Sequence, residues 1–317
     1  MKRVLLYMVD FYSYRTAIMQ ELNNQNYEVT CFDDNVHLNS FEKLFSLVFP
    51  FYKHRKFDRY FNKTLSKQNY DLILIVFGGF FFKKKHIDLL KKQYPDTPIV
   101  FYAWDAVKNF PNTKELIESC DRSYTFDRDD ASEFSIPYLP LFYINRGDPN
   151  IKKEYDASVI ATLFDKKLPS VIRVLDCCKA VKPFVYLRVK SKLHKIQMLL
   201  KHRKEYRAIE KYCYFKNLNR DEVMDVFSKS KVIIDFPIPH QTGLTMRTIE
   251  ALALGCKIVT TNKNVKYHDF YSEDNIFIID DDTKEIPLSF FEKPFNEKYA
   301  ISEEYSISSF IKKLVNK

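Results

Sequence analysis

Glycine and tryptophan are scarce in this chain of 317 residues, which has only 5 Gly and 1 Trp. So little glycine excludes collagen and glycine-rich low-complexity repeats. Hydrophobic residues make up 46% of the chain, enough to bury a large core, and this excludes intrinsic disorder. The length allows one large domain or two of about 150 residues each.

Cysteine is also sparse and shows no metal-binding spacing. The 6 Cys residues form no CxxC pair and have no nearby histidines, and no HExxH motif occurs. Structural zinc sites need such spacings. We therefore expect reduced, mostly buried thiols and no structural metal.

Long hydrophobic runs are missing as well. The longest apolar stretch, residues 72–82, contains two glycines and stops at three consecutive lysines. A bilayer-spanning helix needs roughly 20 apolar residues. Only six apolar residues separate Arg3 from Asp10, too few for the core of a signal peptide. We therefore expect a cytoplasmic protein. Its formal net charge is +9.

Short β-rich runs alternate with helix-length amphipathic segments along the whole chain, a pattern typical of parallel βαβ units. In the first half we expect strands at residues 4–9, 27–32, 72–77, 99–103, 123–126 and 136–139. In the second half we expect them at 157–163, 184–189, 212–215, 232–236, 257–261 and 276–279. Asn219 and Glu222 have the spacing of a capping box and predict a helix start between two of these strands.

A polar, turn-rich segment between Tyr143 and Glu154 separates the two series of strands. We therefore expect one α/β domain over residues 1–150 and a second over residues 151–300. Residues 301–317 form an amphipathic C-terminal segment, which we expect to be helical and to pack back on the first domain.

The segment after the strand at 232–236 carries the most chemistry. A turn over 237–241 leads into an expected helix over 242–254, which Gly255 ends. At about 100° per residue, Arg247 and Glu250 lie on one stripe of this helix, while apolar residues cover most of the rest. The sequence thus predicts a buried helix whose two charges lie near its amino end.

Free amides and the helix dipole make that end a site for an anion. A diphosphate can bind the amides near Thr242 and Gly243, with Thr245 and Arg247 as further donors and Glu250 accepting from ribose hydroxyls. The alternative is an Arg247 to Glu250 ion pair within the helix, beside an ordinary threonine cap. Such a pair contributes only a few tenths of a kcal/mol, and charges are rarely buried without a partner. We therefore favour the ligand site.

The signature Arg-x-x-Glu-Ala-Leu-Ala-x-Gly begins at Arg247 and ends at Gly255. In this motif the chain resembles bacterial glycosyltransferases of lipopolysaccharide and capsule synthesis, which have the two-Rossmann-domain GT-B fold. Other stretches look like this group too: residues 240–247, 260–264, 102–105, 108–109, 111–112 and 123–127. The resemblance spans most of the chain.

The resemblance implies an α/β protein of GT-B fold, with two Rossmann-like domains facing across a cleft. It implies a glycosyltransferase that moves a sugar from a nucleotide-sugar donor to a lipopolysaccharide, lipooligosaccharide or capsular glycan acceptor, without a required metal. The first domain would bind the acceptor and the second the donor. The donor-binding residues it implies are His240, Gln241, Thr242, Gly243, Leu244, Thr245, Arg247 and Glu250.

Two features of the chain bear on this assignment. Many retaining relatives carry a Glu-x7-Glu pattern, but Thr242 stands where the first acid would be, so retention or inversion stays open. After the strand at 157–163, this fold often places a basic residue on phosphate, and we assign Lys166 to that role. The alternative for Lys166 is a solvated turn lysine.

Inverting glycosyl transfer needs a base for the acceptor hydroxyl and stabilisation of the departing diphosphate. Carboxylates that follow strands of a parallel sheet are the candidates. Asp10 follows the first strand, and Asp105 follows the strand at 99–103. The alternative for each is a helix cap or a structural hydrogen bond.

Asp127 and Asp129 match the Asp-x-Asp pattern that holds a divalent metal in the other major glycosyltransferase fold, GT-A. Two acids in three residues arise often by chance. They also suit the capped start of a helix, which we favour over a metal site. A metal-dependent GT-A enzyme is therefore the weaker hypothesis.

Basic and aromatic residues interleave in one part of the first half. The aromatics are Phe45, Phe49, Phe51, Tyr52, Phe57, Tyr60 and Phe61, and the basic residues are Lys53, His54, Arg55, Lys56, Arg59 and Lys63. Such surfaces suit an anionic inner leaflet, so we expect peripheral contact with the cytoplasmic face of the inner membrane. Single-stranded nucleic acid is an alternative, but no RNA-binding motif occurs. A third interpretation places the aromatics in the core.

The partners expected are thus a nucleotide-sugar donor, a glycan or lipid-linked glycan acceptor, and the membrane surface. A different class of function is also compatible with these residues. The chain can be a non-catalytic nucleotide-sugar-binding module or partner subunit that retains the Arg247 and Glu250 site. That hypothesis predicts donor binding without turnover.

Overall fold

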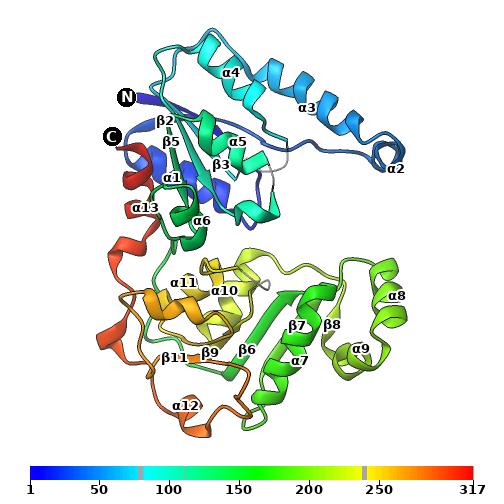
Figure 1. Cartoon of the computed structure of the whole chain (residues 1–317). Helices are drawn as coiled ribbons and strands as arrows, with labels where there is room; N and C mark the ends of the chain where they lie inside the picture. The colour runs from blue at the N-terminus through cyan, green and yellow to red at the C-terminus, as the bar shows by residue number, and fades with distance from the viewer. Residues whose placement is uncertain (78–80, 111, 238–240, 317) are drawn as a thin grey trace. The chain divides into compact units, whose positions relative to one another are not determined.

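A computed structural model of the chain describes residues 1–77, 81–110, 112–237 and 241–316, apart from the side chains of Ser40 and Lys166. The chain folds into two compact units (Figure 1). Unit 1 comprises Met1–Pro140 and Ile307–Lys317, and unit 2 comprises Leu141–Ser306. The C-terminal helix, α13 (Ile307–Val315), is therefore part of unit 1.

The sheet of unit 1 is parallel, with five strands in the order β2-β1-β3-β4-β5. The strands are β1 (Lys2–Tyr7), β2 (Tyr27–Phe32), β3 (Leu72–Val76), β4 (Ile99–Ala103) and β5 (Arg122–Thr125). Every residue of β3 and β4 is buried. Continuous apolar runs are what strands covered on both faces require.

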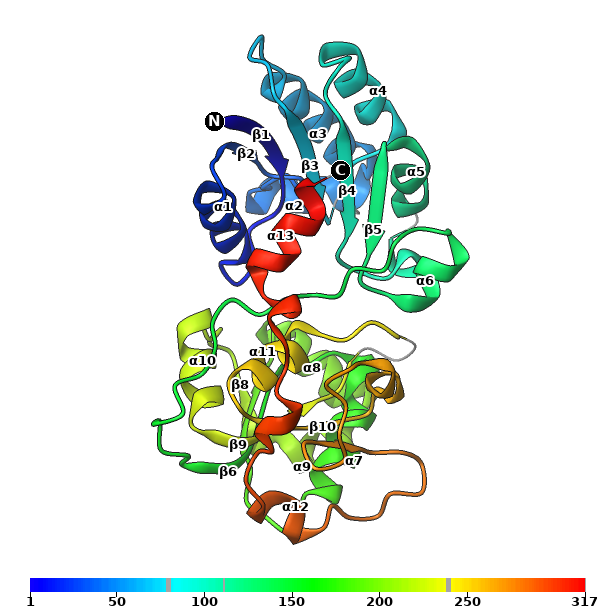
Figure 2. The same ribbon diagram turned by 90° about the vertical axis from the view of Figure 1, so that its left-hand side faces the viewer.

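Helices cover both faces of this sheet. On one face, alternate strand residues pack with α3 (Phe51–Thr64), α4 (Lys84–Gln93) and α5 (Asn112–Ser119). On the other lie α1 (Tyr14–Asn24) and α13, which contact each other. Figure 2 shows α13 in front of the strands. The ring of Phe310 on α13 lies 4.9 Å from that of Tyr102 on β4, edge to face, so the C-terminal helix completes this layer.

Unit 2 contains a parallel sheet of six strands in the order β11-β10-β9-β6-β7-β8. The strands are β6 (Tyr155–Thr162), β7 (Phe184–Arg188), β8 (Cys213–Tyr214), β9 (Ser230–Asp235), β10 (Lys257–Thr260) and β11 (Ile276–Ile278). One face packs with α7 (Leu168–Cys177), α8 (Lys192–Lys201), α9 (Arg203–Ile209) and α12 (Leu288–Glu292). The other is covered by α10 (Arg220–Ser228) and α11 (Met246–Ala253).

The segment expected to separate two domains, residues 143–154, lies within unit 2. Gly147 N donates to Ala253 O at 2.9 Å, which holds this segment against the end of α11. A Cβ at Gly147 would lie 2.7 Å from the carbonyl oxygen of Leu254. Only glycine permits such a close approach of two backbones.

Eleven of the twelve expected strands are present, but the one expected at 136–139 is wrong. There, Tyr138 makes only an isolated parallel bridge to Thr125. Pro137 and Pro140 flank this position, and proline has no N–H to donate to a sheet.

The capping box of α10 is confirmed: Glu222 N donates to Asn219 Oδ1 at 2.9 Å, and Asn219 N donates to Glu222 Oε2 at 2.8 Å. Gly255 ends α11 with a φ of 66°.

Candidate functional site

The strand order of unit 2 reverses between β6 and β9. β6 is the first strand of this sheet in chain order. β7 and β8 follow on one side of it, and β9, β10 and β11 then lie on its other side. In open parallel sheets, ligands bind beyond the carboxyl ends of the strands at such a switch point. The side chains beyond β6 and β9 are therefore the first place to look for a site.

Asp235, the last residue of β9, is the centre of the polar contacts there. It is 1% exposed and accepts hydrogen bonds from Thr245 Oγ1 at 2.7 Å and Thr248 Oγ1 at 2.8 Å. It also forms a short ion pair with the guanidinium of Arg247. No role was expected for Asp235 from the sequence, although a lone acid in an apolar strand indicates a buried charge that requires partners.

Arg247 connects the two strands on either side of the switch point. Besides pairing with Asp235 on β9, its Nη2 donates to Ile160 O on β6 at 2.9 Å. The side chain is 20% exposed, and a guanidinium has more N–H groups than these two contacts use. Arg247 is thus fixed in place while part of it stays accessible to an anion.

The helix that carries Arg247 starts later than expected. α11 begins at Met246, so the expected start at Thr242 is wrong. Thr245 is the cap, because its Oγ1 accepts from Thr248 N at 3.3 Å while donating to Asp235. The amino end of the helix therefore lies at Thr245 to Arg247, and the amides of Thr242 and Gly243 precede it.

The loop before α11 is fixed by side-chain amides. Asn262 Nδ2 donates to the carbonyl oxygens of Thr242 and Gly243, both at 3.2 Å, and Gln241 Nε2 donates to Gly243 O at 3.1 Å. Leu244 is 3% exposed and packs in the interior. His240 lies outside the described residues. The donor-binding roles assigned to these loop residues stay predictions.

A second cation, Lys167, lies near Arg247 at the switch point of the unit 2 sheet. Lys167 ends the short 3-10 helix after β6, and its Nζ lies 5.9 Å from the centre of the Phe236 ring. Burial and the charge of Arg247 lower the pKa of Lys167 to about 8, although Asp235 opposes the shift. The residue expected on phosphate from the sequence is the neighbouring Lys166, whose side chain is outside the described part. Two adjacent lysines cannot be told apart without the turn geometry.

Glu250, on the same helix as Arg247, has a different partner. It is 4% exposed, and its Oε1 accepts from Arg220 Nη2 at 2.8 Å. Arg220 is the first residue of α10, and its side chain is 14% exposed. Arg247 thus binds β9, whereas Glu250 binds α10. The contact of Glu250 with a ribose stays a prediction.

The two candidate bases of unit 1 differ in their surroundings. The Asp105 carboxylate, just beyond β4, accepts from Ala106 N and Asn109 Nδ2, both at 2.8 Å. Burial raises the pKa of Asp105, and the charge of Asp127 adds to the shift, while these two hydrogen bonds oppose it. The Asp10 carboxylate is 43% exposed and lies 3.7 Å from Arg15. A shielded carboxylate with a raised pKa is the better general base near neutral pH.

Asp127 caps a helix, as its alternative interpretation predicted. It is 2% exposed, and its Oδ1 accepts from Asp129 N at 3.0 Å at the start of α6 (Arg128–Glu133). Asp130 accepts from Val107 N at 2.8 Å, and burial raises its pKa to about 6. Among the described residues, no three His, Cys, Asp or Glu side chains are grouped to share a metal ion. Metal-independence stays a prediction.

Aromatic rings surround the loops beyond β1, β3 and β4. Trp104 lies 5.2 Å from Phe11, edge to face, and Phe77 lies 5.1 Å from Phe110. The backbone is strained here, with φ of 48° at Tyr12 and 83° at Phe77. Bulky residues adopt positive φ only where the surroundings enforce it, and such strain gathers at functional sites.

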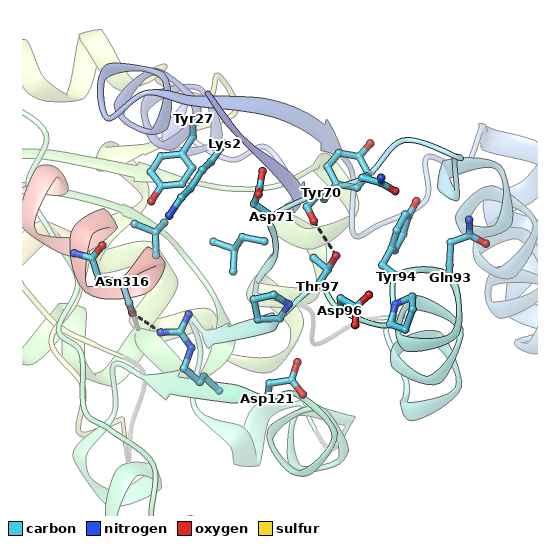
Figure 3. A pocket seen from close by; sticks show the side chains of 16 residues that line it. Lys2, Tyr27, Tyr70, Asp71, Gln93, Tyr94, Asp96, Thr97, Asp121 and Asn316 are labelled. Atoms are coloured by element: carbon cyan, nitrogen blue, oxygen red, sulfur yellow. Dashed lines mark hydrogen bonds between the residues drawn. The ribbon is translucent and has the colours of Figure 1, made fainter.

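A cavity of about 890 Å³ opens at the amino ends of the strands of unit 1, at the other end of the sheet from these aromatic loops. Figure 3 shows its polar lining, which includes Lys2, Asp71, Asp96 and Asp121. Because it lies at the amino ends of the strands, it is not where a parallel sheet binds its ligand. We assign it no part in the site.

No protein-family model matches the chain. No curated protein matches it either. Solved structures do match. AviGT4, a glycosyltransferase involved in avilamycin A biosynthesis, is 10% identical with a TM-score of 0.63, over 99% of this chain and 96% of that one.

Two further matches bind uridine nucleotides. HepE from Anabaena, solved with UDP-glucose, is 11% identical with a TM-score of 0.56, over 99% of this chain and 95% of that one. A UDP-GlcNAc 2-epimerase from Neisseria meningitidis, bound to UDP-GlcNAc, is 13% identical with a TM-score of 0.57, over 99% and 98%. The expected GT-B fold of two parallel-sheet α/β domains is confirmed. Because the epimerase has this fold too, the fold does not select the reaction.

Proposed function

We propose that the protein is a glycosyltransferase that uses a nucleotide-sugar donor. The observation that supports this most is the placement of Lys167 and Arg247 at the switch point of unit 2, beside the amino end of α11. Two cations and a helix terminus suit a diphosphate, which carries several negative charges. Unit 2 would hold the donor, and unit 1 the acceptor.

The reaction assigns a distinct task to each group. The acceptor hydroxyl oxygen forms a bond to the anomeric carbon of the sugar, and the bond from that carbon to the diphosphate oxygen breaks. The acceptor proton passes to a base, which we assign to Asp105. Lys167 and Arg247 stabilise the negative charge that develops on the departing diphosphate. Glu250 would accept from the ribose hydroxyls.

The donor site can be tested by removing its fixed cation. Arg247→Ala is expected to weaken donor binding by about 1–3 kcal/mol, the scale of a lost charge-assisted hydrogen bond. Glu250→Ala is expected to weaken it by a similar amount. Calorimetric titration with the donor measures both. Lys231→Ala is the matched control, since it removes a half-exposed cation from the first part of β9. Equal donor affinities in the wild type and all three variants would contradict the assignment of Arg247 and Glu250 to the donor site.

The pH dependence of donor binding tests Lys167. Its pKa of about 8 means that the side chain is a cation below pH 8 and neutral above it. Donor affinity should therefore be highest near pH 7 and fall by about tenfold or more by pH 9.5, because one charge-assisted contact is lost. In Lys167→Arg the cation persists at all these pH values, so the affinity should be flat. An affinity that falls equally in both proteins would exclude Lys167 as the titrating group.

For the acceptor, we propose a lipopolysaccharide, lipooligosaccharide or capsular glycan presented at the cytoplasmic face of the inner membrane. The signature that begins at Arg247 supports this class. The aromatic rings beyond β1, β3 and β4 are suitable surfaces for sugar rings. In the part of the chain that the structure describes, no helix is both long and apolar enough to cross a bilayer.

The reaction itself is tested by mixing donor and protein with and without glycan acceptor. A transferase releases nucleoside diphosphate and extends the glycan only when both substrates are present. A donor that binds but is never consumed would support the non-catalytic module. An altered sugar on an intact donor would indicate an epimerase and would overturn the proposal.

A further inference from the structure

We propose that α2 (Ser40–Val48) docks unit 1 on an anionic lipid bilayer. This inference is independent of the reaction assigned above, because it depends on a surface and not on the donor or acceptor residues. Figure 1 shows α2 at the edge of unit 1, next to α3. Unlike a normal surface helix, it exposes its large apolar side chains.

The apolar side chains of α2 face solvent. Phe41 is 76% exposed, Leu44 64%, Leu47 75% and Val48 70%. Ser46, by contrast, is 3% exposed. A helix at the surface of a soluble protein normally buries its apolar stripe and exposes its polar one. α2 instead leaves its apolar residues exposed, and an exposed apolar face of this kind indicates an external partner.

Polar contacts fix α2 in this orientation. Glu42 Oε1 accepts from Lys56 Nζ at 2.6 Å and from Tyr52 Oη at 2.7 Å, both on α3. Glu42 also forms a capping box with Asn39. The bonds from Lys56, Asn39 and Tyr52 together lower the pKa of Glu42 to about 2. Turning the helix to bury its leucines would break these contacts.

The apolar surface continues beyond the helix. Phe49 is 40% exposed and Phe51 52% exposed, and the Phe49 ring lies 4.7 Å from that of Phe45 and 5.8 Å from that of Phe51. The expectation that Phe57 and Phe61 also belong to this surface is wrong, because they are 1% and 0% exposed and lie in the core of unit 1. We call Phe41, Leu44, Leu47, Val48, Phe49 and Phe51 the α2 patch.

The charges near the α2 patch select the partner. Residues 40–64 contain six Lys or Arg and only two carboxylates, Glu42 and Asp58. Both carboxylates are paired, Glu42 with Lys56 and Asp58 with Lys85. Arg55 and Arg59 are exposed on α3. An apolar helix face beside an excess of cations matches an anionic membrane interface. A second copy of this chain would bring like charges together.

The test is sedimentation of the full chain with vesicles. Wild-type protein should pellet with vesicles that contain phosphatidylglycerol, bind pure phosphatidylcholine vesicles much more weakly, and be released from the former by high salt. The double variant Leu44→Asp, Leu47→Asp should bind phosphatidylglycerol vesicles at least about tenfold more weakly. Leu288→Asp changes a leucine that is 48% exposed on α12 and serves as the matched control, with unchanged binding expected.

Three outcomes would overturn the proposal: wild-type protein that stays in the supernatant, a double variant that binds as well as wild type, or equal binding to both vesicle types. A concentration-dependent dimer that the double variant abolishes would assign the α2 patch to a second copy instead. Thermal unfolding checks that the variants are folded. Donor titration of the double variant should match that of wild type, so a failure here is distinguishable from a failure of the proposed reaction.

Discussion

Asp105→Asn is expected to lower turnover by about 10²- to 10⁴-fold, the usual contribution of a general base, while the donor Kd stays unchanged. Asparagine keeps the shape of the side chain and an oxygen that can accept from Ala106 N and Asn109 Nδ2. It cannot take a proton from the acceptor hydroxyl. The raised pKa of Asp105 also has a consequence for the pH dependence of turnover. As the pH is lowered, turnover should begin to fall at a pH above the ordinary aspartate pKa of about 3.9.

Asp10→Asn is the matched control for this prediction. Asp10 is more exposed and lies near Arg15, so its loss should change turnover far less. Steady-state rates at saturating donor, together with donor titrations, separate chemistry from binding. If Asp105→Asn turned over normally while Asp10→Asn did not, the base would be Asp10. Normal turnover in both variants would favour a retaining mechanism, which Thr242 leaves open.

Arg220→Ala is expected to reduce the free energy of unfolding by about 3–5 kcal/mol, the cost of removing one member of a buried ion pair. Glu250 is 4% exposed and faces Arg220 at 2.8 Å. Without that cation, the carboxylate must either stay charged in a poorly solvated place or take up a proton. Chemical denaturation with the Arg220→Ala variant measures the loss.

Two further proteins make this result specific. Adding Glu250→Gln to Arg220→Ala removes the charge that was left behind, so the double variant should regain much of the stability. Lys216→Ala breaks the exposed pair with Glu222 on the same helix and should leave stability nearly unchanged. If the three variants were equally stable, the pair would contribute nothing to the fold, and the position of Glu250 would need another explanation.

Most of the fold followed from periodicity because parallel strands covered on both faces are continuous apolar runs. The exception at 136–139 has an apolar pattern, but its prolines cannot donate to a sheet. The start of α11 was misplaced because Thr242 and Thr245 are both suitable caps, and only the contact from Thr245 to Asp235 decides between them. Local sequence does not contain that long-range contact.

The candidate site was recovered only in part for the same reason. Arg247 and Glu250 stood out as charges on an otherwise apolar helix, but their partners, Asp235 and Arg220, lie 12 and 30 residues away in the chain. Lys167 stood out only through its position relative to Arg247, which the sequence does not show. Likewise, aromatic residues that looked alike in sequence separated into the core and the α2 patch once α3 was placed.

The proposed donor site in unit 2 can be tested by calorimetric titration of the chain with UDP, GDP, CDP and dTDP and with their sugars, in Mg²⁺ and again in EDTA. We expect one nucleotide and its sugar to bind, EDTA to leave the affinity unchanged, and Lys167→Met combined with Arg247→Ala to abolish the binding. No heat with any nucleotide, or full affinity in the double variant, would contradict a donor site at the switch point of unit 2. Binding that EDTA removes would contradict the expected metal-independence.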